Sequence, residues 1–415
     1  MSRLLITQLS IEGMRSLDQV ELDLAPRGAD TPGADDARPT ATPTVLIGPN
    51  GAGKSTIVEA CELLRKAGSE RPFVGKLFDA HGGPPALLRK NAKRLRIGVR
   101  LMSGRGVELT YSLSLRSVGT SLTVEQEVAT LQEPTKVKQL LLERVQNSYV
   151  LPHPDARSPE YPVEGDDLAL TTAALGTPEL KAIQSALASI EVHTAVDVRA
   201  PWTMVSSGEV GPRASNVVRP VTRVELGGRN LPNVYHALRN QKDWSETLAR
   251  IRLALGDQIE SVITPADPSG GRIGLALDVR GIGEIEAFAM SDGQLAYLAL
   301  LGVLRLKRPV PPALVVFDEP DLHLHPGLTR RLMADLETFS RSTTVLVATH
   351  SDAMLDALTD PAMSSVLCEL DEHHATRLVR PDSASLSSWL EDYRGLGELR
   401  AAGYEHVVFP TLESP

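Results

Sequence analysis

A short apolar run followed by a glycine-rich loop and a helical pattern constrains the fold of this chain more than any other feature. Residues 44–47 read Thr-Val-Leu-Ile, and the next eight residues match the G-x-x-x-x-G-K-[ST] pattern. The glycines let the backbone curl so that several N–H groups point at phosphate oxygens, and the following helix presents its positive N-terminal end. The pattern therefore predicts a phosphate-binding loop in an α/β fold. The residues expected to contact a nucleotide are Gly48, Pro49, Asn50, Gly51, Ala52, Gly53, Lys54, Ser55 and Thr56.

A second apolar run, over residues 314–317, ends in the two carboxylates Asp318 and Glu319. Combined with the phosphate loop, this pattern predicts the chemistry of phosphoryl transfer. Ser55 and Asp318 are expected to hold Mg²⁺. Lys54 is expected to reach the β- and γ-phosphates, and Glu319 is expected to polarise the water that attacks the γ-phosphate.

Two further segments carry candidate site residues. Residues 290–294 read Met-Ser-Asp-Gly-Gln, in which Ser291 and Gln294 have the spacing of a capping box. This spacing predicts a helix that begins with free N–H groups and a hydroxyl aimed outwards, and such a terminus binds anions. Residues 345–348 form an apolar strand that places His350 just beyond its C-terminal end, which is where ligands bind in an open α/β sheet.

Composition restricts the class of protein. The 415 residues carry a net charge of −9, with 42% hydrophobic and 23% charged residues, which is typical of a soluble globular protein. The longest apolar run, residues 295–304, is about half the roughly 20 residues that a membrane span needs, and no secretory signal is readable. The 2 cysteines are too few for a disulfide framework or a Cys-based zinc site. We therefore expect a cytoplasmic protein with no membrane partner.

The hydrophobic periodicity predicts an α/β fold with a mixed sheet and an N-terminal antiparallel β subdomain. Residues 25–43 are rich in Pro, Gly, Ala and Asp, and we expect them to form a flexible surface insertion. Strands are expected over residues 4–11, 20–24, 44–47, 95–101, 261–263, 274–279, 285–289, 314–317 and 344–348. Helices are expected over residues 55–67, 135–146, 180–189, 292–306, 326–339 and 353–358, with two more within 231–255.

Taken in this order, the segments GPNGAGKST, MSDGQ, FDEPDLHLHP and ATHS resemble the ABC-type ATPase module, in the branch shared by RecF, SMC and overcoming-lysogenization-defect (OLD) proteins. The resemblance implies an ABC-ATPase head-like P-loop NTPase fold, ATP and Mg²⁺ as cofactors, and hydrolysis of ATP. It also implies a nucleotide sandwiched between two subunits, where Ser291 and Gly293 touch the γ-phosphate held by the partner and His350 senses the same phosphate in cis. The turn around Arg15 resembles the Phe-Arg-Ser element of this branch, which suggests Arg15 as a nucleotide contact. The implied catalytic residues are Glu319, Lys54 and His350.

The same resemblance suggests how the chain is divided. It implies an N-terminal ATPase lobe with the phosphate loop over residues 1–130, an inserted helical/β region over residues 131–280, and a C-terminal ATPase lobe over residues 281–415. Residues 225–240, 291–304 and 387–399 also look like compact bacterial ATPases that accompany phage-defence or toxin-like genes. The glutamine-loop residue stays open, with Gln126 and Gln132 as candidates.

The leading interpretation is an ATP-driven switch that closes as a homodimer, or as a higher homo-oligomer, and controls a separate effector in bacterial anti-phage defence. The segment after His350 holds no cluster of carboxylates, whereas an OLD-type protein would continue into a nuclease domain. We therefore expect the effector, a nuclease or a toxin, to be encoded separately.

The alternative interpretation is a RecF-like DNA-repair ATPase that binds duplex DNA. Arg94, Arg96 and Arg100 alternate with apolar residues, so they share one face of an expected strand. This face is either a solvated surface or a patch for nucleic acid or a partner. A third interpretation, an ATP-binding scaffold without turnover, is disfavoured because a scaffold has no need of a base such as Glu319.

Overall fold

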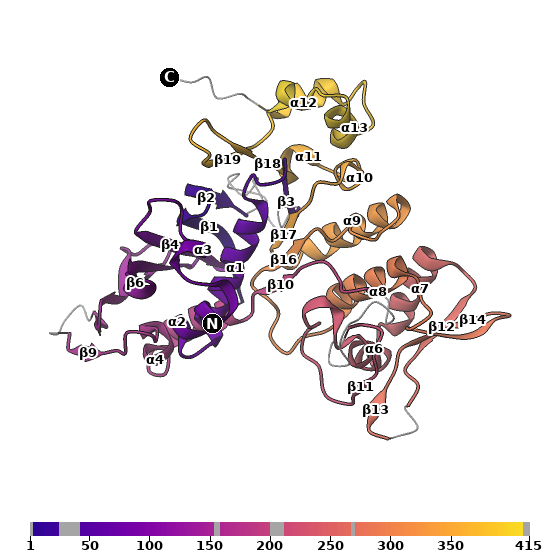
Figure 1. Cartoon of the computed structure of the whole chain (residues 1–415), viewed down its shortest axis with the longest axis horizontal. Helices are drawn as coiled ribbons and strands as arrows, with labels where there is room; N and C mark the ends of the chain where they lie inside the picture. Colours follow the sequence, from indigo (N-terminus) through magenta and orange to yellow (C-terminus); the bar gives the residue numbers. More distant parts are fainter. Residues whose placement is uncertain (1–2, 25–41, 153–157, 200–210, 267–269, 410–415) are drawn as a thin grey trace.

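The computed structural model describes residues 3–24, 42–152, 158–199, 211–266 and 270–409 (Figure 1). Residues 4–162 supply an antiparallel sheet with the strand order β2-β1-β4-β5-β6-β7-β8-β9. Adjacent strands pair antiparallel, and the register shifts once in β1 with β4, once in β5 with β6 and once in β6 with β7. The strands are β1 (Leu4–Met14), β2 (Leu17–Asp23), β4 (Arg94–Ser103), β5 (Glu108–Val118), β6 (Ser121–Gln132), β7 (Gln139–Val145), β8 (Ser148–Val150) and β9 (Glu160–Pro162).

A second sheet carries the predicted nucleotide motifs. Its order is β10-β16-β17-β3-β18-β19, and every neighbouring pair is parallel except β18 with β19. The apolar runs that predicted strands are fully buried in β3 and β17, as expected for a sheet covered on both faces. Its strands are β3 (Thr44–Ile47), β10 (Glu191–His193), β16 (Val315–Asp318), β17 (Val345–Ala348), β18 (Ser365–Leu370) and β19 (Thr376–Val379).

Helix α1 (Lys54–Ser69) packs between the two sheets. It contacts β1 and β4 of the antiparallel sheet and β10, β16 and β17 of the parallel sheet. Alternation along β16 explains how both faces are covered, because Val316 belongs to the core on the α1 side while Val315 and Phe317 belong to the core on the opposite side. The other helices near α1 are α2 (Phe73–His81), α3 (Pro84–Leu87), α4 (Ala169–Ala173) and α5 (Pro178–Ala188).

The opposite face of the parallel sheet is covered by α8 (Asp292–Arg305) and α9 (Pro326–Ser340), drawn in orange in Figure 1. Helices α6 (Leu231–Arg239) and α7 (Trp244–Leu255) pack against α8. Short strands follow: β11 (Asn216–Val217), β12 (Ile259–Ile263), β13 (Arg272–Ile273), β14 (Ala276–Val279) and β15 (Gly283–Glu286). The remaining elements are the 3-10 turn η2 (Leu226–Gly228), α10 (Asp352–Leu355), α11 (Pro361–Ser364), α12 (Ser383–Trp389), α13 (Leu396–Ala401) and α14 (Glu405–Val408).

The α/β fold class with a mixed sheet and an N-terminal antiparallel subdomain is confirmed. The helix expected over residues 135–146 is wrong, because these residues contain β7, which pairs with β6. Of the insertion expected at residues 25–43, residues 25–41 lie outside the described residues. Within the described part of the chain, no helix combines the length and the apolar character that crossing a bilayer would need.

A buried ion pair fixes the antiparallel sheet to the segment before α4. The side chains of Arg144 and Glu127 are both 0% exposed, with Nη1 3.0 Å from Oε1. Glu127 also accepts hydrogen bonds from the backbone N–H groups of Ala169 at 2.6 Å and Leu170 at 3.1 Å. Burial raises the pKa of the Tyr111 hydroxyl, which donates to Glu127, well above its ordinary value. The hydroxyl therefore stays protonated as a donor.

Replacing Arg144 with methionine is expected to lower the free energy of unfolding by about 3–5 kcal/mol, because it leaves a buried carboxylate without its cation. Urea unfolding followed by circular dichroism measures the loss. The matched control is Arg116→Met on β5, whose side chain is 53% exposed and 4.0 Å from Glu125. The control is expected to change stability by less than about 1 kcal/mol. Equal losses in the two variants would contradict this account.

Candidate nucleotide site

The phosphate loop joins β3 to α1 and depends on glycine at both ends. Gly48 has φ of 136°, and a Cβ there would come within 2.1 Å of the Cys368 carbonyl oxygen. Gly53 has φ of 97°, and its Cβ would lie 2.4 Å from the Thr376 hydroxyl. Both the left-handed backbone and the close approach to β18 and β19 exclude larger residues. The loop is therefore fixed by packing as well as by its own sequence.

Lys54 is the first residue of α1 and is 6% exposed. Its ammonium group donates to the carbonyl oxygens of Gly48 at 2.7 Å and Pro49 at 3.1 Å. The lysine thus folds back over its own loop, which places its charge where the loop curls around an anion. The contact of Lys54 with nucleotide phosphates stays a prediction.

Two side-chain oxygens of the predicted Mg²⁺ site lie close together at the start of α1. The Ser55 hydroxyl lies 3.4 Å from Oδ1 of Asp318, the last residue of β16. Burial raises the pKa of the Asp318 carboxyl, and Glu319 adds to this, whereas the Ser55 hydrogen bond and the Lys54 charge oppose it. A cation bound beside Asp318 would stabilise the charged form of its buried carboxyl group.

The donor set at Ser55 and Asp318 fits Mg²⁺. This ion prefers oxygen ligands, keeps several waters, and is commonly held by one or two protein oxygens together with substrate phosphates. Across the described residues, no group of three or more His, Cys, Asp or Glu side chains is arranged to hold a metal ion. If Mg²⁺ binds at Ser55 and Asp318, waters or nucleotide phosphates would have to supply its other ligands.

Glu319 and His350 lie together at the ends of β16 and β17. Glu319 has φ of 50°, and its N–H donates to the Ala348 carbonyl at 2.8 Å, so its backbone is held in a left-handed turn. Nδ1 of His350 lies 2.7 Å from Oε2 of Glu319, yet this buried oxygen has no aligned hydrogen-bond donor among the described residues. The two side chains are thus close without being locked to each other.

The helix predicted at Ser291 is confirmed, including its capping box. The Gln294 N–H donates to the Ser291 hydroxyl at 3.2 Å, and the Ser291 N–H donates to the Gln294 side chain at 2.9 Å. A Cβ on Gly293 would lie 3.0 Å from the His323 carbonyl oxygen. The start of α8 therefore packs against the loop that follows Glu319.

Sequence reasoning missed Arg213, which holds the turn before α8. Its side chain is 6% exposed and Nη2 lies 2.6 Å from Oδ1 of Asp292. No local pattern marks this arginine, because its partners are mostly backbone carbonyls distant in sequence. Its Nη1 donates to the carbonyl oxygens of Ala287 at 2.9 Å, Phe288 at 3.0 Å and Met290 at 2.8 Å.

Arg15 lies near α1, where it pairs with an acidic side chain. It has φ of 47°, and its guanidinium lies 2.5 Å from Glu59, one turn beyond Ser55 on α1. His81 contacts the same carboxylate at 2.8 Å. The structure thus brings Arg15 to the helix of the phosphate loop but pairs it with Glu59, and its contact with a nucleotide stays a prediction.

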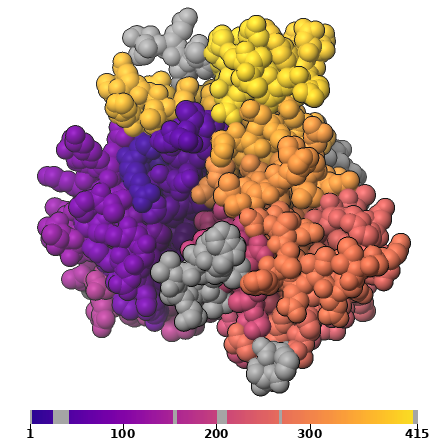
Figure 2. Space-filling view, turned by 45° about the vertical axis from the view of Figure 1, so that its right-hand side comes forward, coloured from indigo at the N-terminus to yellow at the C-terminus, as the bar shows by residue number. Residues whose placement is uncertain are grey.

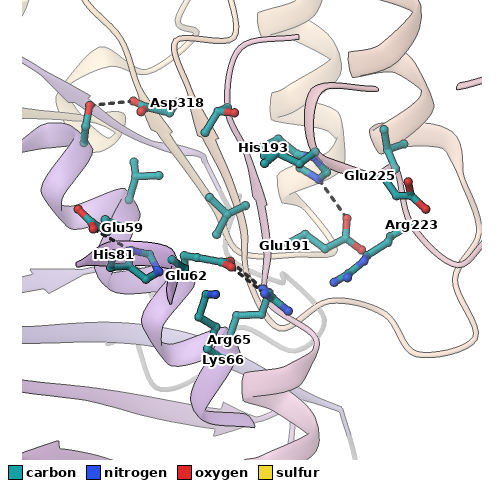
Figure 3. Close-up of a pocket in the computed structure, with 17 residues that line it drawn as sticks. Glu59, Glu62, Arg65, Lys66, His81, Glu191, His193, Arg223, Glu225 and Asp318 are labelled. Carbon is teal, nitrogen blue, oxygen red and sulfur yellow. Dashed lines mark hydrogen bonds and ion pairs between the residues drawn. The ribbon is translucent and has the colours of Figure 1, made fainter. Parts of the chain in front are cut away.

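A cavity of about 530 Å³ extends from Ser55 and Asp318 along α1 (Figure 3). Its far side holds Glu191 and His193 of β10, which sequence reasoning missed and which are 7% and 8% exposed. Although burial opposes it, hydrogen bonds from His193 and Arg308 lower the pKa of the Glu191 carboxyl below its ordinary value. Arg308, which follows α8, contacts Glu191 at 2.5 Å and 2.7 Å.

The candidates for the glutamine loop do not lie in this cavity. Gln126 and Gln132 belong to β6 of the antiparallel sheet. The strand beside Asp318 is instead β10, whose His193 is aligned with Phe317. The lining of the cavity on that side is therefore supplied by residues 191–194.

The arginine face of β4 is paired with carboxylates. The side chains of Arg94, Arg96 and Arg100 are 64%, 51% and 44% exposed, as the alternating pattern predicts. Their positive charge is offset by neighbouring glutamates on the same sheet. The pairs are Arg94 with Glu125 at 2.8 Å, Arg96 with Glu12 at 3.8 Å and Arg100 with Glu108 at 3.5 Å.

Comparison with protein families finds two matches along the chain. Residues 189–356 match a family model described as "AAA domain, putative AbiEii toxin, Type IV TA system". Residues 8–73 match a second model described as an AAA domain. The first match includes Ser291, Asp318, Glu319 and His350, and the second includes the phosphate loop.

Among curated proteins, the chain is 30% identical over 107 residues to Protein ea59 of Escherichia phage lambda. The match covers 25% of this chain and 20% of that protein, so the chain spans about a fifth of the length of this relative.

Among solved structures, the chain is similar to an SMC head domain from Thermotoga maritima, with 13% identity and a TM-score of 0.45. That similarity covers 91% of this chain and 99% of the other. An Smc head domain bound to the C-terminal domain of ScpA, derived from Pyrococcus furiosus, matches with 16% identity and a TM-score of 0.46. It covers 94% of this chain and 100% of the other.

Proposed function

We propose that this chain is an ABC-type ATPase of the branch that includes RecF and SMC proteins, and that it acts as a switch driven by binding and hydrolysis of ATP. Two AAA-domain family models match it, over residues 8–73 and 189–356. The observation that carries the proposal is the meeting of the phosphate loop with Asp318, whose Oδ1 lies 3.4 Å from the Ser55 hydroxyl. Lys54 neutralises charge on the β- and γ-phosphates, and Ser55 and Asp318 hold Mg²⁺. In these roles the three residues would hold the phosphates in place and stabilise the charge that develops when the γ-phosphate is transferred.

Hydrolysis is assigned to Glu319. Its carboxylate directly follows Asp318, the proposed Mg²⁺ ligand, and its Oε2 lies 2.7 Å from Nδ1 of His350. The carboxylate accepts a proton from the attacking water, while His350 responds to the γ-phosphate from the end of the neighbouring strand β17.

We propose further that two copies close on ATP as a sandwich dimer. The start of α8 supports this role, because a helix N-terminus offers free N–H groups and a positive dipole end to an anion. Ser291 and Gly293 are at that start, and Arg213 holds the preceding turn rigidly. In the dimer, Ser291 and Gly293 contact the γ-phosphate bound by the partner's phosphate loop.

The closed dimer controls a separately encoded effector, a nuclease or a toxin, in bacterial anti-phage defence. Support for this setting comes from the matched family model, whose description includes the AbiEii toxin and a type IV toxin–antitoxin system. In this proposal residues 1–130 and 281–415 form the two ATPase lobes, and residues 131–280 form the inserted region. ATP and Mg²⁺ are the only cofactors that the proposal requires.

The RecF-like role in DNA repair is not favoured. Duplex binding draws its affinity from unpaired Lys and Arg side chains that neutralise phosphates. On the proposed contact face, the arginines of β4 instead have carboxylate neighbours, such as Glu125 at 2.8 Å from Arg94. These acids would repel a DNA backbone.

The test is the mass of the protein with and without Mg-ATP, compared with that of Ser291→Arg. Wild-type protein is expected to double in mass, measured by light scattering under conditions of slow turnover. Ser291→Arg is expected to bind ATP as a monomer but to weaken dimerisation at least about 100-fold, because a long side chain occupies the contact and loses the cap. Nucleotide affinity is measured separately with a fluorescent ATP analogue.

The matched control is Ser121→Arg, an exposed serine on β6 outside the proposed contact. It is expected to dimerise like the wild type. If Ser291→Arg dimerises with ATP as well as the control does, the sandwich arrangement is wrong. If wild-type protein binds no ATP at all, the switch itself is refuted.

A further inference from the structure

The segment after His350 is packed beneath a group of short helices. We call residues 383–409 the C-terminal helical unit; it contains α12, α13 and α14, coloured yellow at the top of Figures 1 and 2. Helix α13 lies on α10, which begins at Asp352. The packing is backbone to backbone, since a Cβ on Gly397 would lie 2.1 Å from the Asp352 carbonyl oxygen. We therefore expect α13 to move together with the segment that carries His350.

Polar contacts join the same two segments. Arg400 of α13 is 18% exposed, and its Nη1 lies 3.4 Å from the His350 carbonyl oxygen and 3.3 Å from Oδ1 of Asp352. The Glu398 N–H donates to Oδ1 of Asp356 at 2.9 Å. The guanidinium thus contacts the backbone carbonyl of His350, whereas the His350 ring contacts Glu319.

The C-terminal helical unit is internally tied by stacked aromatic rings. Trp389 lies 5.1 Å from Tyr404 and 6.0 Å from Tyr393, measured between ring centroids. Tyr393 and Tyr404 are 6.1 Å apart. Rings packed in this way connect the end of α12 to the segment after α13. The unit therefore has a built-in tryptophan whose surroundings change if the helices shift.

We propose that Arg400 is a positioning residue for His350, and that the C-terminal helical unit shifts with the nucleotide state. This role rests on the proposed function, and the C-terminal helical unit is the part of the molecule that responds to the bound nucleotide. His350 now lies 2.7 Å from Oε2 of Glu319. A γ-phosphate brings negative charge that repels Glu319 and attracts the imidazole, so the ring changes partner when ATP binds. Because packed segments shift between discrete arrangements, α10 and α13 move with it.

The first experiment reads the fluorescence of Trp389 alone. Trp202 and Trp244 are replaced by phenylalanine, which leaves one tryptophan. Mg²⁺ with a non-hydrolysable ATP analogue is expected to change the Trp389 emission, with saturation at the same concentration as direct binding of the analogue. Mg-ADP, which lacks the γ-phosphate, is expected to bind without this change.

The second experiment removes the contact. Arg400→Ala is expected to lower kcat about tenfold while KM stays within about threefold, because the γ-phosphate contact is misplaced and the binding of the other phosphates is kept. In the single-tryptophan background, Arg400→Ala is expected to abolish the emission change, and Arg400→Lys is expected to restore part of it. The matched control is Arg394→Ala, whose side chain is 76% exposed and contacts Glu398.

The outcomes separate this inference from the proposed function. Absence of ATP binding by the wild type refutes the proposed function. ATP hydrolysis with a silent Trp389, or with unchanged kcat in Arg400→Ala, overturns the inference alone. If Arg400→Ala fails to fold, Asp352→Asn is the second variant. It removes the charge of the carboxylate that pairs with Arg400 on the His350 side, while the pair with Glu405 at 3.2 Å is kept, and it is expected to reduce both kcat and the emission change. Normal values in Asp352→Asn then overturn the inference.

Discussion

Replacing Lys54 with alanine is expected to remove measurable ATP hydrolysis and to weaken ATP binding at least about 100-fold. Lys54 is the buried cation that folds over the phosphate loop, 2.7 Å from the Gly48 carbonyl. Charge-assisted hydrogen bonds are each worth about 1.5–3 kcal/mol, and the ammonium is assigned to two phosphates. Titration calorimetry of Mg-ATP binding and a phosphate-release assay measure the two losses.

The control for Lys54→Ala must separate lost charge from lost folding. Lys76→Ala removes an exposed lysine on α2, near α1, and is expected to bind ATP like the wild type. Thermal melts of both variants check that the loop substitution leaves the fold intact. Lys54→Ala protein that is folded and still binds Mg-ATP within about threefold of the wild type would disprove the phosphate-loop assignment.

Replacing Glu319 with glutamine is expected to give the second largest effect. General-base catalysis contributes about 10²–10⁴-fold to a rate, so kcat is expected to fall by at least about 100-fold. Binding of Mg-ATP should be kept, because the amide has the same size and Asp318 and Ser55 are unchanged. With hydrolysis slowed, the closed dimer is expected to accumulate, and light scattering detects it as a doubled mass in ATP but not in ADP.

Glu372→Gln provides the comparison for Glu319→Gln, since Glu372 is 78% exposed in the turn between β18 and β19. It is expected to hydrolyse ATP at the wild-type rate. An unchanged kcat in Glu319→Gln would refute the base assignment. A fall in kcat without accumulation of dimer would keep the base and reject the sandwich.

The sequence predicted those parts of the fold and site that rest on local patterns. The runs at β3, β16 and β17 are almost entirely apolar because the parallel sheet is covered on both faces, so they were predicted as buried strands. The capping box at Ser291 is likewise local, since its hydrogen bonds join residues three apart. Ser55 and Asp318 are separated by 263 residues, and their closeness was expected from combining two local patterns, the phosphate loop and the apolar strand that ends in carboxylates.

The misses have a common physical cause. Residues 135–146 looked helical, yet β7 within them is set by pairing with β6. Arg144 in β7 is buried because Glu127 lies opposite it on β6. Arg213 and Arg308 are likewise defined by partners distant in sequence, so no spacing rule finds them. The roles of the site residues and the division into lobes stay predictions.

The contacts of the phosphate loop also determine at what stage of translation the candidate nucleotide site can fold. Its strand β3 is flanked by β17 and β18, and Gly48 and Gly53 pack against Cys368 and Thr376, more than 300 residues later. The phosphate loop is therefore synthesised early, but the strands that pack against it, β18 and β19, are synthesised near the end of the chain. On the proposed function, the site for ATP is therefore completed only after most of the chain has been synthesised.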